Sequence, residues 1–255
     1  MPPGLDYTIF AVTDLSMCTS SHDGGTSFLE PYSTGARLKV DDSAMNESSE
    51  PSADQIDPTY GFADFIQSMD IILCGRGSYD QIMHCNSGQW PYPKQRLIVF
   101  TSTPLTEPVP QRSESSKCAN NADCYQTTDV GACLCLSGPQ LSHHPPPPNA
   151  EAFSGDPLQL VQKLAKESVK ARKFKRESVW VMGGPAVRGA MLQLGVVERV
   201  ELVMVPRVMS SPGGIPLWSF GDDESGNNNV DLELIDCRSY ENGVVSLSYS
   251  VVGRS

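Results

Sequence analysis

The stretch Ser178–Leu194, SVWVMGGPAVRGAMLQL, decides the fold of this chain. Its apolar run Val179–Met182 predicts a short buried strand. Gly183 and Gly184 follow as a tight turn, and Pro185 suits the first position of a helix, where its missing N–H is not needed. Apolar residues then recur at helical spacing along one face: Ala186, Val187, Ala190, Met191 and Leu194. The stretch therefore predicts a strand, a glycine turn and a helix.

Such a corner is suited to binding an anion. Glycine lets a ligand approach the backbone closely, and the unpaired N–H groups at the positive end of a helix attract phosphate. A glycine pair also makes an ordinary strand-to-helix corner, so this stretch alone leaves both interpretations open.

Composition narrows the class of protein. The chain has 255 residues, with 19 basic and 30 acidic side chains and a net charge of -11. This balance argues against a nucleic-acid surface and favours a small-molecule ligand. The sequence predicts neither a membrane span nor a secretory leader. Cys18, Cys74 and Cys237 lie in or beside apolar runs and are predicted as buried thiols, so we expect a cytoplasmic protein.

Apolar runs elsewhere alternate between strand and helix patterns. Strands are predicted at Tyr7–Thr13, Asp70–Cys74, Gln95–Thr101, Asn149–Phe153, Glu198–Pro206, Val230–Asp236 and Val244–Val252. Helices are predicted at Tyr60–Ser68, after the Gly75–Tyr79 turn through Met83, and from Pro157 after an Asp156 cap. Asn242-Gly243 predicts a closing hairpin. The fold class is therefore α/β, a three-layer sandwich around a mostly parallel sheet with an antiparallel C-terminal end.

Three segments interrupt this alternation. Residues 14–35 are predicted as a long loop with Phe28 as an anchor, and residues 41–58, with six acidic side chains and no basic one, as a mobile insertion. Residues 106–148 carry seven prolines and form a second insertion of one domain spanning 1–255. Zinc binding by this insertion is an alternative to free thiols, through Cys118, Cys124, Cys133, Cys135, His143 and His144.

A second glycine turn, Gly75-Arg76-Gly77-Ser78, follows another predicted strand. Arg76 suits a bidentate phosphate contact, and Ser78 adds a hydroxyl; a surface arginine beside a helix cap is the alternative. Thr101 and Ser102 end the next strand, where hydroxyls cap turns or bind ligands at the carboxyl edge of a sheet.

The order of these motifs resembles the dihydrofolate reductase superfamily, and within it the reductase domain of riboflavin biosynthesis and its stand-alone relatives. The resemblance is carried by DIILCGRGSYDQI, YPKQRLIVFTSTPL, FSGDPLQLVQKL, the extended stretch from VWVMGG to VPRVM, and GGIPLW. It implies an eight-stranded sheet flanked by helices, NADPH as cofactor, and a homodimer.

The resemblance also implies roles for individual residues. Gly75, Arg76 and Ser78 would meet the cofactor phosphates, and Thr101 and Ser102 would lie near the adenosine and its 2′-phosphate. Other predicted cofactor residues are Gly183, Gly184, Ala186 and Val187 around the pyrophosphate, and Ala11 and Val12 beside the nicotinamide.

Two departures from the family pattern concern the substrate side. The family's Ser-x-Asp-Gly after the first strand is here Ser16-Met17-Cys18-Thr19, and its Gly-x-Gly loop is replaced by residues 210–214, SSPGG. The catalytic residue stays unassigned, with Asp23 in a later Asp-Gly-Gly as its candidate. Ser16 and Arg207 are the substrate-side candidates.

The leading hypothesis is an NADPH-dependent reductase of a ribosylamino-pyrimidine, a pterin-like compound or another small heterocycle. Its substrate would lie between the first strand and the loop at 14–35. The alternative is a catalytically inactive nucleotide-binding or scaffold protein of the same fold, and a third hypothesis is a zinc-dependent regulator.

Overall fold

The computed structural model describes residues 4–21, 25–39, 56–57, 59–106, 145–170, 176–209, 214–221 and 229–253. Its main sheet has eight strands: β1 (Leu5–Thr13), β5 (Ile71–Gly75), β6 (Arg96–Phe100), β7 (Ala150–Phe153), β8 (Glu177–Gly183), β9 (Val197–Met204), β11 (Asp231–Ser239) and β12 (Val245–Gly253). The helices that cover it are α1 (Phe62–Ser68), α2 (Arg76–Cys85), α3 (Pro157–Lys170) and α4 (Pro185–Gln193). The predicted order of strands and helices is confirmed.

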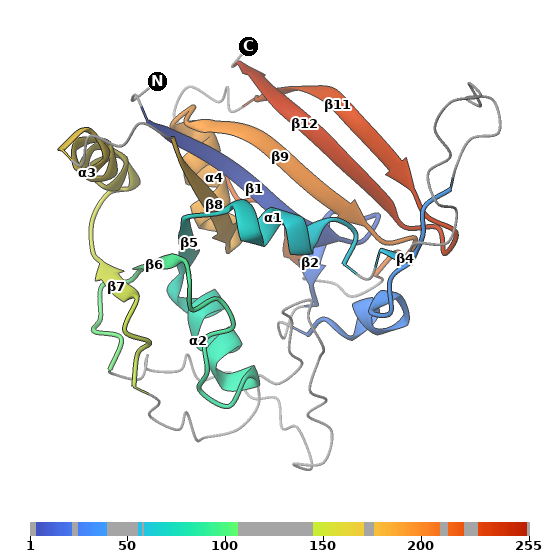
Figure 1. Ribbon diagram of the computed structural model, residues 1–255, viewed down its shortest axis with the longest axis horizontal. Helices are drawn as coiled ribbons and strands as arrows, with labels where there is room; N and C mark the ends of the chain where they lie inside the picture. The colour runs from blue at the N-terminus through green and yellow to red at the C-terminus, as the bar shows by residue number, and fades with distance from the viewer. Residues whose placement is uncertain are drawn as a thin grey trace.

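The strand order is β11-β12-β9-β1-β8-β5-β6-β7. Neighbours from β9 to β7 are parallel, whereas β12 runs antiparallel to both β9 and β11. The first strand is therefore central, with β8 on one side and β9 on the other (Figure 1). The mostly parallel sheet with its closing antiparallel hairpin is the predicted fold class.

Each face of the sheet carries its own apolar core, because successive strand side chains point to opposite faces. On one face, Leu160 and Leu164 of α3 and Met191 of α4 pack against strand residues such as Val181. On the other, Phe62 of α1 and Tyr79 of α2 join an aromatic cluster around Trp180. The helices thus form the two outer layers of the predicted sandwich.

The helix starts follow the sequence signals. Pro157 and Pro185 open α3 and α4, and the Asp156 carboxylate accepts a hydrogen bond from the Leu158 N–H at 2.7 Å. In α1 the side chain of Phe62 is buried. Proline at the first helical turn and an acidic cap are local features, so they are readable without tertiary information.

The segment at 14–35 is more ordered than a plain loop. It contains β2 (Cys18–Ser20), which pairs antiparallel with β10 (Ile215–Pro216), and a 3-10 helix, η1 (Ser27–Tyr32). Phe28 is 4% exposed, which confirms it as an anchor. The pairing partner of β2 lies almost two hundred residues away, so a local pattern does not reveal it.

Both predicted insertions lie mostly outside the described residues. Within the first range, β4 (Ile56–Asp57) pairs with β3 (Ala36–Arg37), and the Asp57 carboxylate accepts a hydrogen bond from the Tyr240 hydroxyl at 3.2 Å. The end of that range is therefore tied to the sheet. Of the second range, residues 106 and 145–148 are described, and the cysteines and histidines proposed for zinc fall outside.

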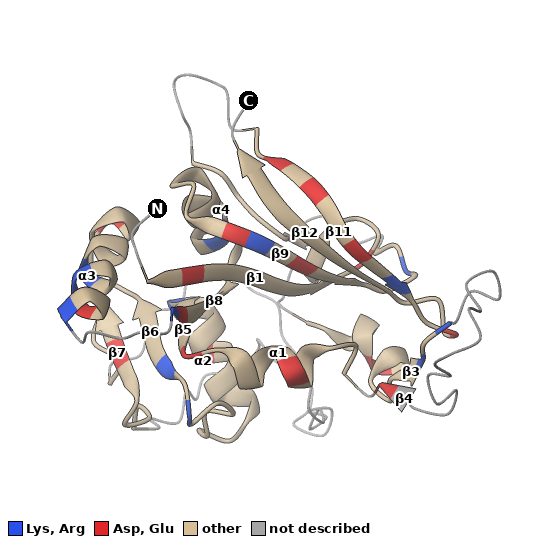
Figure 2. Ribbon diagram, turned by 45° about the horizontal axis from the view of Figure 1, so that its top comes forward, with Lys and Arg blue, Asp and Glu red and all other residues tan. Residues whose placement is uncertain are grey.

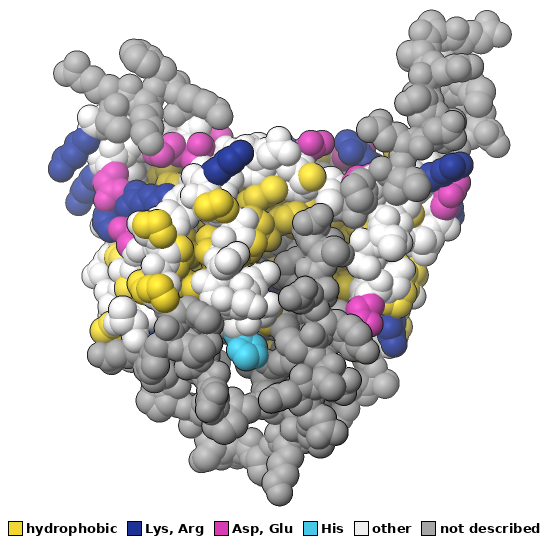
Figure 3. All heavy atoms as spheres, turned by 60° about the horizontal axis from the view of Figure 1, so that its bottom comes forward, with side chains coloured by type: hydrophobic (Ala, Val, Ile, Leu, Met, Phe, Trp, Pro, Cys, Tyr) yellow, Lys and Arg dark blue, Asp and Glu magenta, His cyan; other side chains and the backbone are white. Residues whose placement is uncertain are grey.

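Basic and acidic side chains lie in different parts of the molecule. Lys and Arg cluster on α3 and acidic residues recur along β11 (Figure 2), and charged side chains lie around the margins of the face in Figure 3.

Cys74 is buried as predicted, but Cys18 is half-buried and Cys237 is exposed. The prediction for Cys237 was wrong because β11 is an edge strand, so its apolar neighbours are not covered.

No helix among the described residues is both long enough and apolar enough to cross a membrane. The same part of the chain holds no group of three or more His, Cys, Asp or Glu side chains arranged to bind a metal ion.

Candidate functional site

The two glycine turns predicted from sequence lie side by side. β5 and β8 are parallel neighbours, and Cys74 pairs with Gly183 across them. A Cβ atom built on Gly75 would lie 3.7 Å from the Gly183 carbonyl oxygen and 3.8 Å from the Gly184 nitrogen. Two turns that are distant in sequence therefore form one backbone surface at the carboxyl edge of the sheet.

Two helix N-termini open onto this surface. Gly75 is the N-cap of α2 and Gly184 is the N-cap of α4, and neither helix has a side-chain capping hydrogen bond. Ser78, in the first turn of α2, places its hydroxyl 3.7 Å from where a Cβ on Gly184 would lie. Adjacent helix dipoles and a hydroxyl make a suitable surface for an anion.

The two glycines of the second turn have different constraints. Gly183 has φ +135°, and the peptide between it and Gly184 is cis. A Cβ atom on Gly183 would overlap the Arg188 guanidinium, at 2.7 Å from Nε and 2.8 Å from Cζ. On Gly184, with φ -58°, a Cβ atom would lie 3.7 Å from the Ser78 hydroxyl, and no other atom of the described residues would lie within 4 Å of it. Within the described part of the chain, the space above Gly184 is therefore unfilled.

Arg188 is the residue of this site that sequence reasoning missed. It is 7% exposed, and its Nε donates to the Met182 carbonyl at 3.0 Å. Its Nη1 donates to the Leu217 carbonyl. Burial lowers the pKa of the guanidinium to about 10, so it stays charged at neutral pH. The signal in the sequence is that Arg188 occupies the buried side of α4, where a helix normally carries apolar residues.

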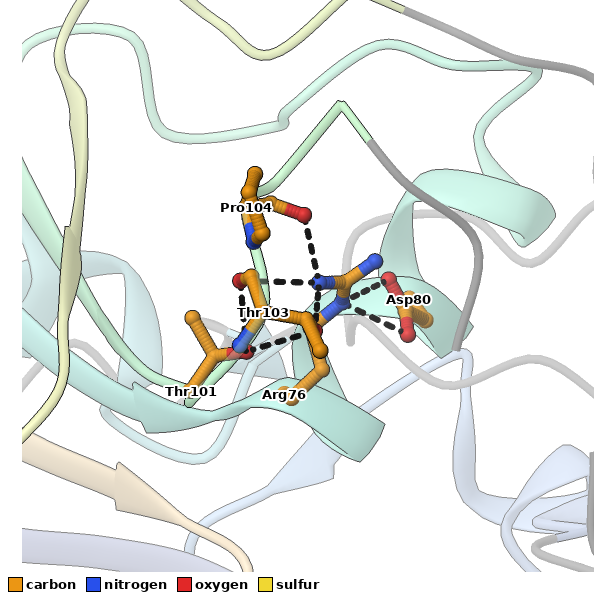
Figure 4. A network of polar contacts seen from close by, with 5 residues as sticks. All are labelled: Arg76, Asp80, Thr101, Thr103 and Pro104. Carbon is orange, nitrogen blue, oxygen red and sulfur yellow. Dashed lines mark hydrogen bonds and ion pairs between the residues drawn. The ribbon is translucent and has the colours of Figure 1, made fainter. Parts of the chain in front are cut away.

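Arg76 forms a network between α2 and the residues after β6 (Figure 4). Its Nε contacts both Asp80 carboxylate oxygens, at 2.8 and 2.9 Å, and its Nη1 donates to the Thr103 hydroxyl at 3.2 Å and the Pro104 carbonyl at 3.1 Å. Burial raises the pKa of Asp80, while Arg76 partly offsets this. The guanidinium therefore has an internal carboxylate partner, which sequence did not indicate.

The two hydroxyl residues after β6 differ: the Thr101 hydroxyl closes a turn, whereas Ser102 lies at the surface. The Thr101 hydroxyl donates to the Thr103 carbonyl at 2.9 Å and accepts from the Thr103 N–H at 3.1 Å, which closes a turn. Ser102 is exposed. Through Thr103, this turn contacts Arg76. The structure thus brings Thr101 and Arg76 into one network, with Ser102 on its outer surface.

The end of β1 separates from β8. Their pairing ends at Thr8 and Trp180, although β1 continues to Thr13, and its last residues pair with β9 alone. Ala11 and Val12 lie in this part of β1, where Ala11 is buried and Val12 is half-buried. Their backbone edge toward β8 is therefore outside the sheet ladder, as a backbone contact with a ligand requires.

The predicted substrate-side residues are held together by a buried carboxylate. Asp14, fully buried, accepts backbone hydrogen bonds from Ser16 at 3.0 Å, Cys18 at 2.9 Å and Met209 at 2.7 Å. The Leu15 N–H donates to the Arg207 carbonyl at 2.8 Å. Ser16 and Arg207, both exposed, are thereby neighbours just past the ends of β1 and β9. Asp23 lies outside the described residues.

Comparison with known proteins supports the fold. The chain superposes on a Shewanella sp. PV-4 protein assigned to riboflavin biosynthesis with a TM-score of 0.56 and 15% identity, covering 96% of this chain and 98% of the other. It superposes on a Thermotoga maritima diaminohydroxyphosphoribosylaminopyrimidine deaminase/5-amino-6-(5-phosphoribosylamino)uracil reductase with a TM-score of 0.53 and 11% identity, covering 97% of this chain and 57% of that protein. At these identities, the likeness shows the fold alone.

In sequence, the chain is 21% identical over 194 residues to the uncharacterized protein YyaP of Bacillus subtilis (strain 168), covering 76% of this chain and 80% of that protein. No protein-family model matches the chain. The predicted likeness to the riboflavin-biosynthesis branch of the dihydrofolate reductase superfamily is thus confirmed as a shared fold.

Proposed function

We propose that the chain is an NADPH-dependent reductase of a small heterocyclic substrate, a ribosylamino-pyrimidine or a pterin-like compound. The observation that carries the proposal is the joining of the Gly75 and Gly183–Gly184 turns into one backbone surface between two uncapped helix N-termini. One extended dinucleotide fits two adjacent phosphate-competent turns better than two unrelated ligands do. The reductase-like fold of the solved neighbours supports this choice.

The residues present fit such a cofactor. Gly183, Gly184, Ala186 and Val187 would hold its pyrophosphate by backbone contacts, since a Cβ on Gly184 would meet only a hydroxyl. The nicotinamide, when bound, supplies the hydride. The backbone of Ala11 and Val12 would orient the ring at the part of β1 that has left β8.

A second group of residues would set the preference for NADPH over NADH. Gly75, Arg76 and Ser78 would contact the cofactor phosphates, while Thr101 and Ser102 would lie near the adenosine and its 2′-phosphate. The Arg76–Asp80 pair already orients the guanidinium and connects it to the turn at Thr103. Because part of its charge is offset by Asp80, we expect Arg76 to act jointly with the two hydroxyls.

The substrate would lie against the nicotinamide, beside Ser16 and Arg207. The exposed Arg207 side chain suits an anionic substituent such as a phosphate. The protein would orient the two reactants and exclude water between them, and the catalytic proton donor stays unassigned, with Asp23 as its candidate.

The test is calorimetric titration of the purified protein with NADPH and NADH. We expect micromolar affinity for NADPH and weaker binding of NADH. Gly184→Ala should weaken binding of both, because its Cβ fills the ligand's approach while meeting only a hydroxyl in the protein. A matched control is Gly221→Ala, whose Cβ would lie 3.9 Å from the Gln193 side chain, at the opposite end of α4 from the turn. Equal binding by wild type and Gly184→Ala would contradict the pyrophosphate position.

A catalytically inactive nucleotide-binding or scaffold protein is the second candidate. The missing Asp-Gly after β1 and the altered 210–214 segment favour it. It predicts NADPH binding without oxidation of the cofactor by any heterocycle in a pyrimidine and pterin panel. The reductase proposal predicts substrate-dependent loss of reduced nicotinamide absorbance.

A homodimer and a cytoplasmic location complete the proposal. β11 is an edge strand of nine residues with Leu234 and Ile235 each 53% exposed, which suits contact with a second copy. Light scattering on wild type and Leu234→Lys tests the dimer, and a monomeric wild type would contradict it. Fractionation of cells that express the chain tests the location.

A further inference from the structure

Arg188 combines burial, charge and incomplete hydrogen bonding. A guanidinium has five N–H donors, and in the described residues only two of those on Arg188 have acceptors, the Met182 and Leu217 carbonyls. In the same residues it forms no ion pair. Buried charges are normally paired, because an isolated ion is costly to remove from water. The counter-charge of Arg188 is therefore missing from the described protein.

The position of this charge indicates where the counter-charge belongs. The guanidinium lies directly against Gly183, so closely that a Cβ there would overlap it. Arg188 is also in the first turns of α4, whose N-cap is Gly184. The helix dipole and the arginine charge therefore act from the same place and with the same sign on whatever binds above the turn.

We propose that Arg188 is a positioning residue whose buried positive charge makes the Gly183–Gly184 turn selective for an anionic group, the pyrophosphate of a dinucleotide. It acts through the turn, and the ligand supplies its counter-charge. The inference rests on the proposed function, since it deepens the assignment of the same turn.

A purely structural role makes a different prediction. Arg188 joins the end of β8 to Leu217, next to β10, and this bridge alone could hold the turn in place. If bridging were its whole role, any substitution that breaks the bridge would weaken charged and neutral ligands alike. If its charge is what matters, binding weakens only in variants without the positive charge, and only for ligands that are anionic.

The test measures binding of inorganic pyrophosphate, NADPH and the neutral nucleoside adenosine by calorimetry. The variants are Arg188→Met, without charge or bridge, and Arg188→Lys, which keeps the charge and loses the two-carbonyl bridge. Arg199→Met, at an exposed arginine of β9, is the matched control. We expect Arg188→Met to weaken pyrophosphate and NADPH by about tenfold or more and Arg188→Lys by less than about threefold, with adenosine unchanged.

The outcomes separate the alternatives. Anion binding by Arg188→Met within about twofold of wild type, or equal losses in Arg188→Met and Arg188→Lys, would overturn the inference. If Arg188→Met does not fold by circular dichroism, Arg188→Gln replaces it, because an amide keeps one donor without the charge. Wild-type binding of pyrophosphate that depends on Arg188, without binding of NADPH, would retain the inference and remove the reductase proposal. Binding of neither anion by wild type would overturn the inference as well.

Discussion

Replacing Asp14 by Ala should cost a large part of the stability of this protein. The side chain is fully buried and accepts three backbone hydrogen bonds, from Ser16, Cys18 and Met209. A hydrogen bond to a charged group contributes about 1.5–3 kcal/mol, and a buried donor left unpaired costs about 1–3 kcal/mol. Ser16 is exposed, so water can replace its partner. We therefore expect a total loss of about 3 kcal/mol, against a typical stability of about 5–15 kcal/mol.

The assay is thermal and urea unfolding of wild type, Asp14→Ala and Asp156→Ala. Asp156→Ala removes the same side chain from an exposed helix cap, where its carboxylate accepts one hydrogen bond, at 2.7 Å from the Leu158 N–H, and should cost about 1 kcal/mol. For a chain of this size, a loss of about 3 kcal/mol lowers the melting temperature by about 6–12 °C. If Asp14→Ala lost no more stability than Asp156→Ala, the reasoning from three buried donors would be refuted.

Further predictions address packing, pH dependence and thiol reactivity. Gly189→Ala should destabilise the protein by about 1–3 kcal/mol in urea unfolding, because its Cβ would overlap the Ser219 backbone, whereas Gly77→Ala should not. Arg76→Ala should lose more stability at pH 7 than at pH 4. Burial raises the pKa of the Asp80 carboxyl and Arg76 partly lowers it, so without Arg76 the ionised carboxylate destabilises the fold once the pH is above its raised pKa. Equal losses of stability at pH 4 and pH 7 would contradict this, as would a double variant, Arg76→Ala with Asp80→Asn, that is no more stable at pH 7 than Arg76→Ala. Cys237 should react with a thiol reagent in the native protein, whereas Cys74, whose pKa is raised by burial, should react only on unfolding; peptide mapping distinguishes them.

Most of the fold was predictable because its signals are local. The apolar run before Gly183, Pro185 at the start of α4 and the Asn242-Gly243 turn each specify one element. The glycine turns were also predictable, and their joint position follows from parallel strands ending at one edge. The family resemblance added the proposal that this edge binds a cofactor, which stays a prediction.

The remaining features depend on contacts between distant residues. Asp14 was predicted only as the start of a loop, because its donors include Met209. Arg188 looked like an ordinary helix residue until Leu217 and Met182 surrounded it. The pairing of β2 with β10 and the exposure of Cys237 likewise depend on sheet order. A sequence pattern records burial tendency, but not which distant group completes a hydrogen bond.

The central place of β1 has a consequence for synthesis of the chain. Leu5–Thr13 are synthesised more than 160 residues before both neighbours of this strand, β8 and β9, which come from residues 177–204. An apolar strand therefore stays without its sheet partners until those residues have been made, and such a strand is prone to aggregation. The Gly75 turn likewise waits for Gly183. The surface that the two glycine turns share therefore forms only after β8 has been made, and a chain stopped before β8 would contain only half of it.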